Sequence, residues 1–567
     1  MLALPRTVEE LLGWDWPQFE PLARELQQRV LDEASLTEWL QDWSDLSAAL
    51  QELYSRRYVA TTVNTADTHA ESAFSHFLDV IYPKSMETEQ ALKSRLLESG
   101  LEPAGFETAL RNLRAQADLF RAENLPLLAE EHRLSTEYDR ISGAQSVPWE
   151  GEERTIAQLR PLLQETERAR REQAWRLSMQ RQLQDRAAFN DLWQRMLDLR
   201  GHIAANAGRP DYRAYRWQQL LRFDYTPADC ARFQDAIEAA VVPAAQRSYE
   251  RRRRQLGVDT LRPWDLEVDP LGRPPLRPYN QLPELVEKTA GIFTRLDPQL
   301  GAYYAIMLQE GLLDLPNRKH KAPGAYCTTY PLVQRPFIFM NAVGVHDDVE
   351  TLLHESGHAF HVFESNAVRL MQLQEVPMEF AEVASMSMEL LAAPYLAAGA
   401  GGFYSPADAA RAQVAHLESS LQFWPYMAVV DSFQHWVYQH PLQAADPAQC
   451  DAAWDELWQR FMPGVDWTGF EESRRTGWQR KPHIFEDPFY YIEYGLAQLG
   501  AVQVWRNSLR DAPAAVCAYR RALALAGSVP LPQLYQAAGA RLAFDTETLS
   551  EAVALMESRI VELSKLD

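Results

Sequence analysis

Apolar residues recur three and four positions apart along most of the chain, the spacing that places them on one face of an α-helix. The segments PLARELQQRVLDEA and QALKSRLLESG show this pattern in the first quarter of the sequence. We therefore expect residues 1–145 to form an all-helical N-terminal lobe, and residues 146–567 to form a second, mostly helical region.

A longer periodic stretch begins after an expected loop at residues 146–153, SVPWEGEE. It runs from Thr155 to Gly208. A glycine with a proline two residues later, here Pro210, is typical of a helix end. The length predicts two long helices. A coiled coil is the alternative, but Arg and Gln occupy would-be core positions of the heptad, which favours packing against the protein's own body.

Two segments interrupt the helical pattern. Residues 261–282 contain five prolines and one glycine, more than a helix or strand interior tolerates, so an ordered crossing between lobes is expected. Residues 324–341, GAYCTTYPLVQRPFIFMN, are dense in β-branched and aromatic residues and predict a small hairpin. The predicted fold class is mainly α with one small β-sheet.

The chain has 567 residues, 46% of them hydrophobic, and a formal charge of −22. A field of this sign repels phosphate backbones and anionic lipid, so we expect neither nucleic acid nor membrane as a partner. The basic run from Arg251 to Arg254 lies in helical text and points around the axis, which favours a solvated helix end.

Four widely separated cysteines form no Cys-x-x-Cys pair, so neither a disulfide framework nor a thiolate zinc site is indicated. Glu9, Glu10 and Asp15 stand where a signal peptide needs an apolar run, and no apolar stretch of about 18 residues occurs. These features predict a cytoplasmic protein with reduced thiols; its oligomeric state is not indicated.

The candidate chemistry lies in DVETLLHESGHAFHVFE, where His354 and His358 form an H-E-x-x-H pattern with Glu355. Residues i and i+4 share a helix face, so both imidazoles can bind one zinc ion. Glu355 is turned about 100° away, where its carboxylate can take a proton from a water on the metal. The structural alternative is a buried helix with two hydrogen-bonded histidines.

A third protein ligand is needed, and the following helical text, VPMEFAEVASMSMELLAAPYL, offers Glu379, Glu382 and Glu389 on one stripe. Carboxylates amid Met, Ala, Val and Leu are costly to bury unpaired, so the stripe indicates a cation or polar site. The alternative is a solvated face. Spacing alone does not decide which glutamate is the ligand.

The text from Gly324 to Leu391 resembles the oligoendopeptidase F branch of the thimet oligopeptidase family of zinc peptidases. HESGHAFH is similar to its H-E-x-G-H-x-x-H signature, and EFAEVASMSMEL to the helix that supplies its third ligand. The resemblance implies one zinc per chain with Glu382 as third ligand, and Glu389 as a residue that orients a ligand histidine. His361 is as compatible with a core histidine as with a functional one.

A third segment, KPHIFEDPFYYIEYGLAQLGA, resembles the family's stretch whose histidine and tyrosines face the zinc. On that basis His483, Tyr491 and Tyr494 are candidate catalytic residues that donate hydrogen bonds to an oxyanion. The register leaves Tyr490 open. Without the resemblance, an aromatic stripe at helical spacing is read as core.

The resemblance, which extends upstream through NAGRPDYRAYRWQQLLRFDYTPADC, implies a zinc endopeptidase in which Glu355 is the general base and short peptides are the substrates. It also implies a two-lobed helical body that encloses a deep channel. The alternatives are a helical zinc carboxypeptidase, a catalytically silent peptide-binding protein, and a ferritin-like di-iron protein. The last needs a second Glu-x-x-His motif, which is missing.

Overall fold

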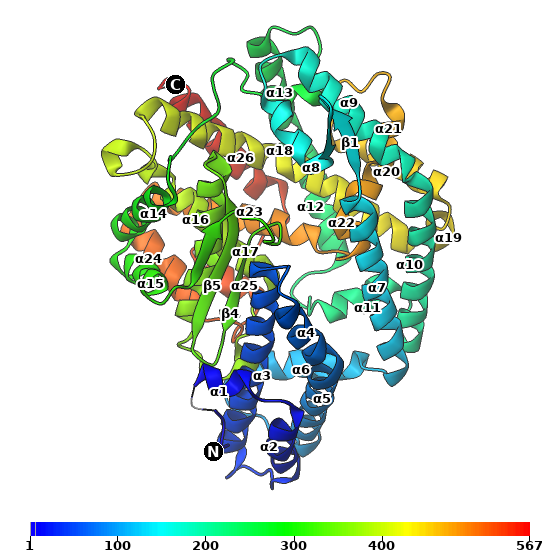
Figure 1. The fold of residues 1–567 in the computed structure, drawn as a ribbon, viewed down its shortest axis with the longest axis vertical. Coiled ribbons are helices and arrows are strands. Elements are labelled where there is room, and N and C mark those ends of the chain that lie inside the picture. The colour runs from blue at the N-terminus through cyan, green and yellow to red at the C-terminus, as the bar shows by residue number, and fades with distance from the viewer. Residues whose placement is uncertain (1, 6, 567) are drawn as a thin grey trace.

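The first helices of the chain lie together at one end of the molecule (Figure 1). They pack around a hydrophobic core of their own, whereas Leu134 and Tyr138 belong to the large core. The computed structural model describes residues 2–5 and 7–566. Trp39 and Trp43 are fully buried in the N-terminal core, which extends in sequence from Leu11 to Leu113. The helical pattern expected for residues 1–145 is confirmed in α1 (Val8–Leu12), α2 (Trp16–Gln28), α3 (Leu36–Val63), α4 (Thr68–His76), α5 (Tyr82–Ser99), α6 (Glu107–Leu119) and α7 (Leu125–Gly143).

The expected loop at residues 146–153 is instead a second small sheet, so the prediction of one sheet was wrong. Strand β1 (Ser146–Trp149) pairs with β2 (Glu152–Thr155) in antiparallel register. Glu150 and Gly151 both have positive φ, 52° and 86°, as a two-residue hairpin turn of this kind requires. Val147 and Trp149 are buried beneath it. The Glu150-Gly151 pair was the feature of the sequence that could have predicted this turn.

The two long helices predicted after this hairpin are present and meet at Asp185. The proline-rich segment has the expected irregular structure, because residues 261–281 hold only a three-residue 3-10 turn, Pro263–Asp265, whereas its crossing between lobes stays a prediction. The helices of this part are α8 (Ile156–Leu159), α9 (Arg168–Gln184), α10 (Arg186–Asn206), α11 (Tyr212–Gln219), α12 (Pro227–Ala240), α13 (Val242–Leu256), α14 (Leu282–Leu296) and α15 (Pro298–Gln309).

The predicted hairpin near residues 324–341 forms from β4 (Tyr326–Tyr330) and β5 (Arg335–Ala342), with Cys327 opposite Ile338. A third strand, β3 (Leu313–Pro316), lies parallel to β5 on its other side, which gives the order β3-β5-β4. Strand β5 is the central strand, and its residues from Pro336 to Met340 are buried. The chain then enters α16 (His346–Ser365) directly.

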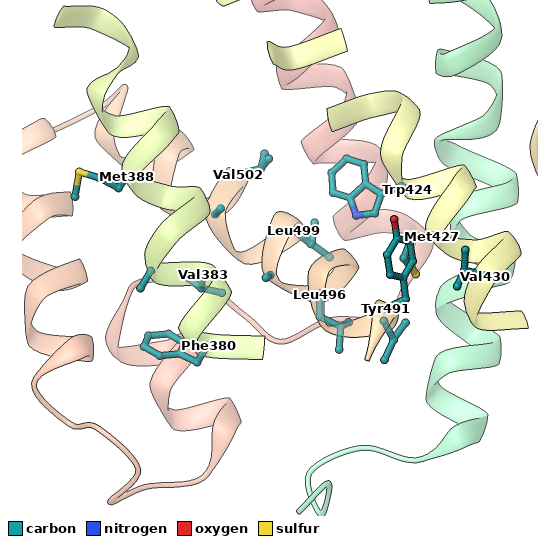
Figure 2. Close-up of a cluster of buried hydrophobic side chains, with 14 of the residues drawn as sticks. Phe380, Val383, Met388, Trp424, Met427, Val430, Tyr491, Leu496, Leu499 and Val502 are labelled. Atoms are coloured by element: carbon teal, nitrogen blue, oxygen red, sulfur yellow. The ribbon is translucent and has the colours of Figure 1, made fainter. Parts of the chain in front are cut away.

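Helices α16, α17 (Met378–Ala392) and α23 (Tyr491–Ser508) lie side by side in the centre of the large core (Figure 1). Figure 2 shows Val383 and Phe380 of α17 beside Leu496 and Leu499 of α23. The remaining helices are α18 (Pro406–Gln439), α19 (Pro441–Ala444), α20 (Pro447–Phe461), α21 (Glu471–Arg475), α22 (Pro482–Phe485), α24 (Ala512–Leu523), α25 (Leu531–Ala537) and α26 (Thr546–Leu563).

The basic run at the end of α13 does not form a single patch. Arg251 pairs with Glu418, while Arg253 and Arg254 both pair with Glu250. Arg252 instead donates to backbone carbonyls of the proline-rich segment, so the expected solvated helix end is only partly correct. Across the described residues, no helix combines the length and apolar character needed to cross a bilayer.

Candidate metal centre

Three predicted ligands converge at the contact between α16 and α17. His354 and His358 stand one turn apart, with ring centroids 5.1 Å from each other. Glu382 Oε2 lies 3.5 Å from His354 Nε2 and 3.8 Å from His358 Nε2. One ligand atom from each residue lies within 4.8 Å of the others, so a single ion can contact all three.

Gly357 allows the two helices to approach closely enough for this geometry. A Cβ at Gly357 would lie 2.6 Å from Ser385 Cα and 2.7 Å from the Ala384 carbonyl oxygen. No real Cβ comes so near to backbone, so any side chain at this position would push α17 away. The glycine between the two histidines therefore sets the position of Glu382, three residues before Ser385.

Glu389 fixes the orientation of the His354 ring. Its Oε1 lies 2.6 Å from His354 Nδ1, which leaves Nε2 directed at the ligand set. The other carboxylate oxygen is 3.4 Å from His416 Nε2, and His416 Nδ1 is 2.6 Å from Glu350 Oε2. This chain of side chains supports the orienting role that the resemblance implied for Glu389. No motif in the sequence pointed to His416 or Glu350.

Glu382 is held from two sides. The Ser385 hydroxyl donates to its Oε2 at 2.9 Å, and the Tyr490 hydroxyl lies 3.4 Å from its Oε1. Ser385 is three residues further along α17, so its helical spacing from Glu382 was the signal that could have identified it.

The donor set fits zinc, for which two imidazoles and one carboxylate are a common catalytic combination with an open fourth position. Burial, together with the charge of His354, lowers the pKa of His358 to about 3, so its ring is neutral and can coordinate. Burial disfavours charge on His354 as well, but Glu389 and Glu382 raise its pKa to about 9. A metal that binds His354 would therefore displace a proton from its ring.

Glu355 lies beside this ligand set and is only 7% exposed. Burial raises the pKa of its carboxyl to about 7, with the positive charge of His354 acting against the shift and Glu382 acting with it. The backbone of Cys327 on β4 hydrogen-bonds to this carboxylate, so the sheet edge and the metal-site helix meet at Glu355. A carboxyl with such a pKa can both accept and return a proton near neutral pH.

The glutamate stripe of α17 divides into different roles. Glu379 accepts a hydrogen bond from Tyr225 at 2.6 Å and lies 3.6 Å from Arg222, so it belongs to a buried ionic cluster away from the ligands. His361, three residues after His358, is buried against Phe380, and its Nε2 has no hydrogen-bond partner among the described residues. The ring of His361 is therefore buried as a core histidine would be, but within the described part of the chain it is not hydrogen-bonded through Nε2, so both interpretations stay open.

His483 on α22 and the tyrosines at the start of α23 lie together near Glu382. The His483 ring centroid is 5.0 Å from that of Tyr491 and 6.1 Å from that of Tyr494. Burial and the neighbouring Lys481 charge lower the pKa of His483 to about 4, which keeps the ring neutral. The hydroxyl that reaches a ligand is that of Tyr490, whereas the Tyr491 hydroxyl accepts a hydrogen bond from Lys481 at 2.7 Å.

The sequence matches the model of peptidase family M3 over residues 161–554, which is most of the chain. The chain belongs to peptidase family M3. The match covers every ligand and catalytic candidate named above, and it makes the protein a metallopeptidase. No curated protein sequence gave a significant match.

Solved structures of other peptidases match this fold over the whole chain. The structure of PZ peptidase A with an inhibitor is 27% identical with a TM-score of 0.87, covering 100% of this chain and 99% of that one. A provisionally assigned oligoendopeptidase F is 26% identical with the same score and coverage. Another, from Bacillus anthracis str. Ames, is 24% identical with a TM-score of 0.83 over 100% and 98% of the two chains, and shows the fold alone. The predicted mainly α fold and the resemblance to oligoendopeptidase F are confirmed.

Proposed function

We propose that the protein is a zinc-dependent oligoendopeptidase that hydrolyses internal bonds of short peptides. The observation that carries this proposal is a buried carboxylate, Glu355, next to a convergent set of two histidines and one glutamate. We propose His354, His358 and Glu382 as the ligands of one zinc ion per chain. Membership of a metallopeptidase family supports this assignment.

When bound, zinc would supply a Lewis acid that polarises the peptide carbonyl and lowers the pKa of water. Glu355 then removes a proton from the attacking water, whose oxygen bonds to the carbonyl carbon. As the C–N bond breaks, Glu355 returns that proton to the leaving amine. The raised pKa of Glu355 suits both transfers, because the group gains and loses a proton near neutral pH.

The developing oxyanion needs donors fixed in advance. We propose His483 and Tyr494 for this role, since the ring of His483 is neutral and burial raises the pKa of the Tyr494 hydroxyl, so both retain a proton to donate. Tyr491 is kept as a third candidate because its ring lies against His483. Tyr490 would instead hold Glu382.

Extended peptides are proposed to align along β4. This strand forms one edge of the three-stranded sheet, and its Cys327 lies at Glu355. Strand addition at such an edge uses main-chain hydrogen bonds, so it places little demand on peptide sequence. A channel that excludes folded proteins, as the family resemblance implies, would restrict the substrates to short peptides.

The protein is proposed to work in the cytoplasm. All four cysteines are free thiols, and two of them, Cys230 and Cys450, are fully buried. Free thiols persist where the surroundings are reducing.

The test is hydrolysis of an internally quenched, C-terminally amidated peptide by wild type and by Glu355→Gln, with metal content measured in both. We expect wild type to cut internally, and the variant to keep about one zinc while activity falls by roughly 10²–10⁴-fold or more, the usual contribution of a general base.

The matched control is Glu364→Gln, on the same helix as Glu355 but bonded to Arg520 at 2.6 Å, which should retain activity. Failure to cut any amidated peptide while free C-terminal residues are released would favour the carboxypeptidase alternative. Zinc binding without turnover would favour the peptide-binding alternative.

A further inference from the structure

A pocket of about 230 Å³ lies beside the metal centre. Met386 lines it from α17, one turn after Glu382, so the pocket adjoins the proposed ligand set. Its volume far exceeds the ~15 Å³ that a single water needs, so it can take a chemical group of a substrate. The lining residues are Met386, Phe423, Lys481, His483, Tyr491 and Tyr494.

Lys481 presents a half-buried ammonium group to this pocket. Its Nζ donates to the Tyr491 hydroxyl at 2.7 Å and lies 4.0 Å from the centroid of that ring and 5.5 Å from that of Tyr426. An ammonium group has three donors, and Tyr491 takes one of them. Among the described residues, no Asp or Glu oxygen lies within 4.0 Å of this Nζ.

A partly buried ammonium group such as that of Lys481 usually has a carboxylate partner. Burial lowers the pKa of Lys481 to about 8, and no acid in the described part of the chain raises it again. The side chain of Lys321 is also withdrawn from solvent, but Asp314 pairs with it at 3.2 Å. Buried charges are normally paired because desolvation is costly, so an unpaired ammonium that faces a pocket indicates an anionic ligand.

The neighbouring residue reinforces the local positive charge. Arg480 is directed at the Thr476 hydroxyl, at 3.3 Å, and the Ser473 carbonyl, at 2.5 Å, rather than at an acid. Burial lowers its pKa to about 10 as well. Within the described part of the chain, these two adjacent cations have no acidic partner within 4.0 Å, although the formal charge of the protein is −22. Arg480 does not line the pocket, so among the described residues Lys481 is the cation that faces it.

We propose that Lys481 binds a carboxylate group of the peptide substrate in this pocket, an inference that rests on the proposed peptidase function. The Tyr491 hydroxyl accepts from Lys481, so its own proton can be donated to the same carboxylate, which leaves His483 and Tyr494 as the donors to the oxyanion. Met386 and Phe423 supply apolar walls for the residue that carries it. If that group is the C-terminal carboxylate, its capture fixes how far from the peptide end the cut falls.

The experiment compares kcat/KM for three N-acetylated peptides of one sequence. The first ends in a free carboxylate, the second in an amide, and the third in an amide with a glutamate placed after the scissile bond. Wild type should favour the first over the second by about tenfold or more, the effect of one hydrogen bond between charged groups. Lys481→Met should bring that ratio close to one, and Lys481→Arg should restore part of it.

Lys288→Met is the matched control, because Lys288 lies on α14 near Glu284 and should leave the ratio unchanged. If the glutamate restores fast cleavage in a Lys481-dependent way, the pocket accepts a side-chain carboxylate as well as the peptide terminus; if it does not, the pocket accepts the terminus alone. Equal kcat/KM for all three peptides in wild type, or a preference that survives in Lys481→Met, overturns the inference.

A binding measurement separates this inference from the proposed function. Calorimetry of wild type with an N-acetyl dipeptide acid and its amide reports the carboxylate preference without turnover, and Lys481→Gln serves if the Met variant fails to fold. Tighter binding of the acid with no hydrolysis of any peptide would overturn the peptidase proposal alone. Equal binding of acid and amide would overturn the carboxylate site.

Discussion

At the scale of single residues, the environment of each acid decides its role. Glu379, Glu382 and Glu389 share one stripe of α17, yet each has a different partner. Glu379 lies against Arg222, Glu382 joins the two histidines, and Glu389 accepts from His354. A carboxylate that holds a ligand histidine through its other ring nitrogen fixes the tautomer and direction of that ring.

Glu389→Ala should therefore weaken zinc binding about 10–100-fold, the usual cost of losing such a partner. Competition with a chromophoric chelator would measure the affinity. Ser387→Ala is the matched control on the same helix, because the Ser387 hydroxyl has no hydrogen-bond partner among the described residues. An unchanged affinity in Glu389→Ala would show that α16 alone orients His354.

At the scale of elements, the site depends on how closely α16 and α17 pack. The histidines belong to one helix and Glu382 to the other, so their separation is an interhelical distance. Gly357 sets it, since a Cβ there would overlap the backbone of Ser385 and Ala384. Gly201 of α10 has no such close neighbour, because an added Cβ there would meet nothing within 4 Å.

Gly357→Ala is expected to lower the free energy of unfolding by about 1–3 kcal/mol, as overpacking does, and to weaken zinc binding by displacing Glu382. Gly201→Ala should instead raise the free energy of unfolding by about 0.5–1 kcal/mol, because alanine favours the helix. Urea unfolding and zinc titration would measure both. Similar behaviour of the two variants would contradict the proposed role of the close contact.

At the scale of the whole molecule, a formal charge of −22 creates a field that acts on any charged peptide. Salt screens this field, because the Debye length falls from about 30 Å at 0.01 M to about 10 Å at 0.1 M ionic strength. The cationic pocket at Lys481 acts only at contact distance. The long-range field therefore attracts positively charged peptides, whereas the pocket at Lys481 binds a negatively charged group.

A peptide with two lysines at its N-terminal end should have a higher kcat/KM than its two-glutamate counterpart at about 0.01 M ionic strength. The difference should shrink to less than about twofold as ionic strength rises to about 0.5 M. Fluorescence assays over a salt series would measure the ratio. A ratio independent of salt would assign the preference to direct contacts instead of the field.

The sequence by itself determined what depends on local spacing. Helical periodicity predicted most of the elements, and the i, i+4 spacing of His354 and His358 placed both rings on one face. Residues dense in β-branched and aromatic side chains predicted the β4–β5 hairpin. The β1–β2 hairpin was missed because its strands have only four residues each, although Glu150-Gly151 supplied the turn.

Only the tertiary structure decided what depends on contacts between distant segments. It joined Glu382 to His354 and His358 across two helices, directed the Tyr490 hydroxyl at Glu382, and connected His416 to Glu389. It also left Lys481 without an acidic partner among the residues that the structure describes. Periodicity reports which face a residue occupies on its own element, whereas the packing of elements decides what that face meets.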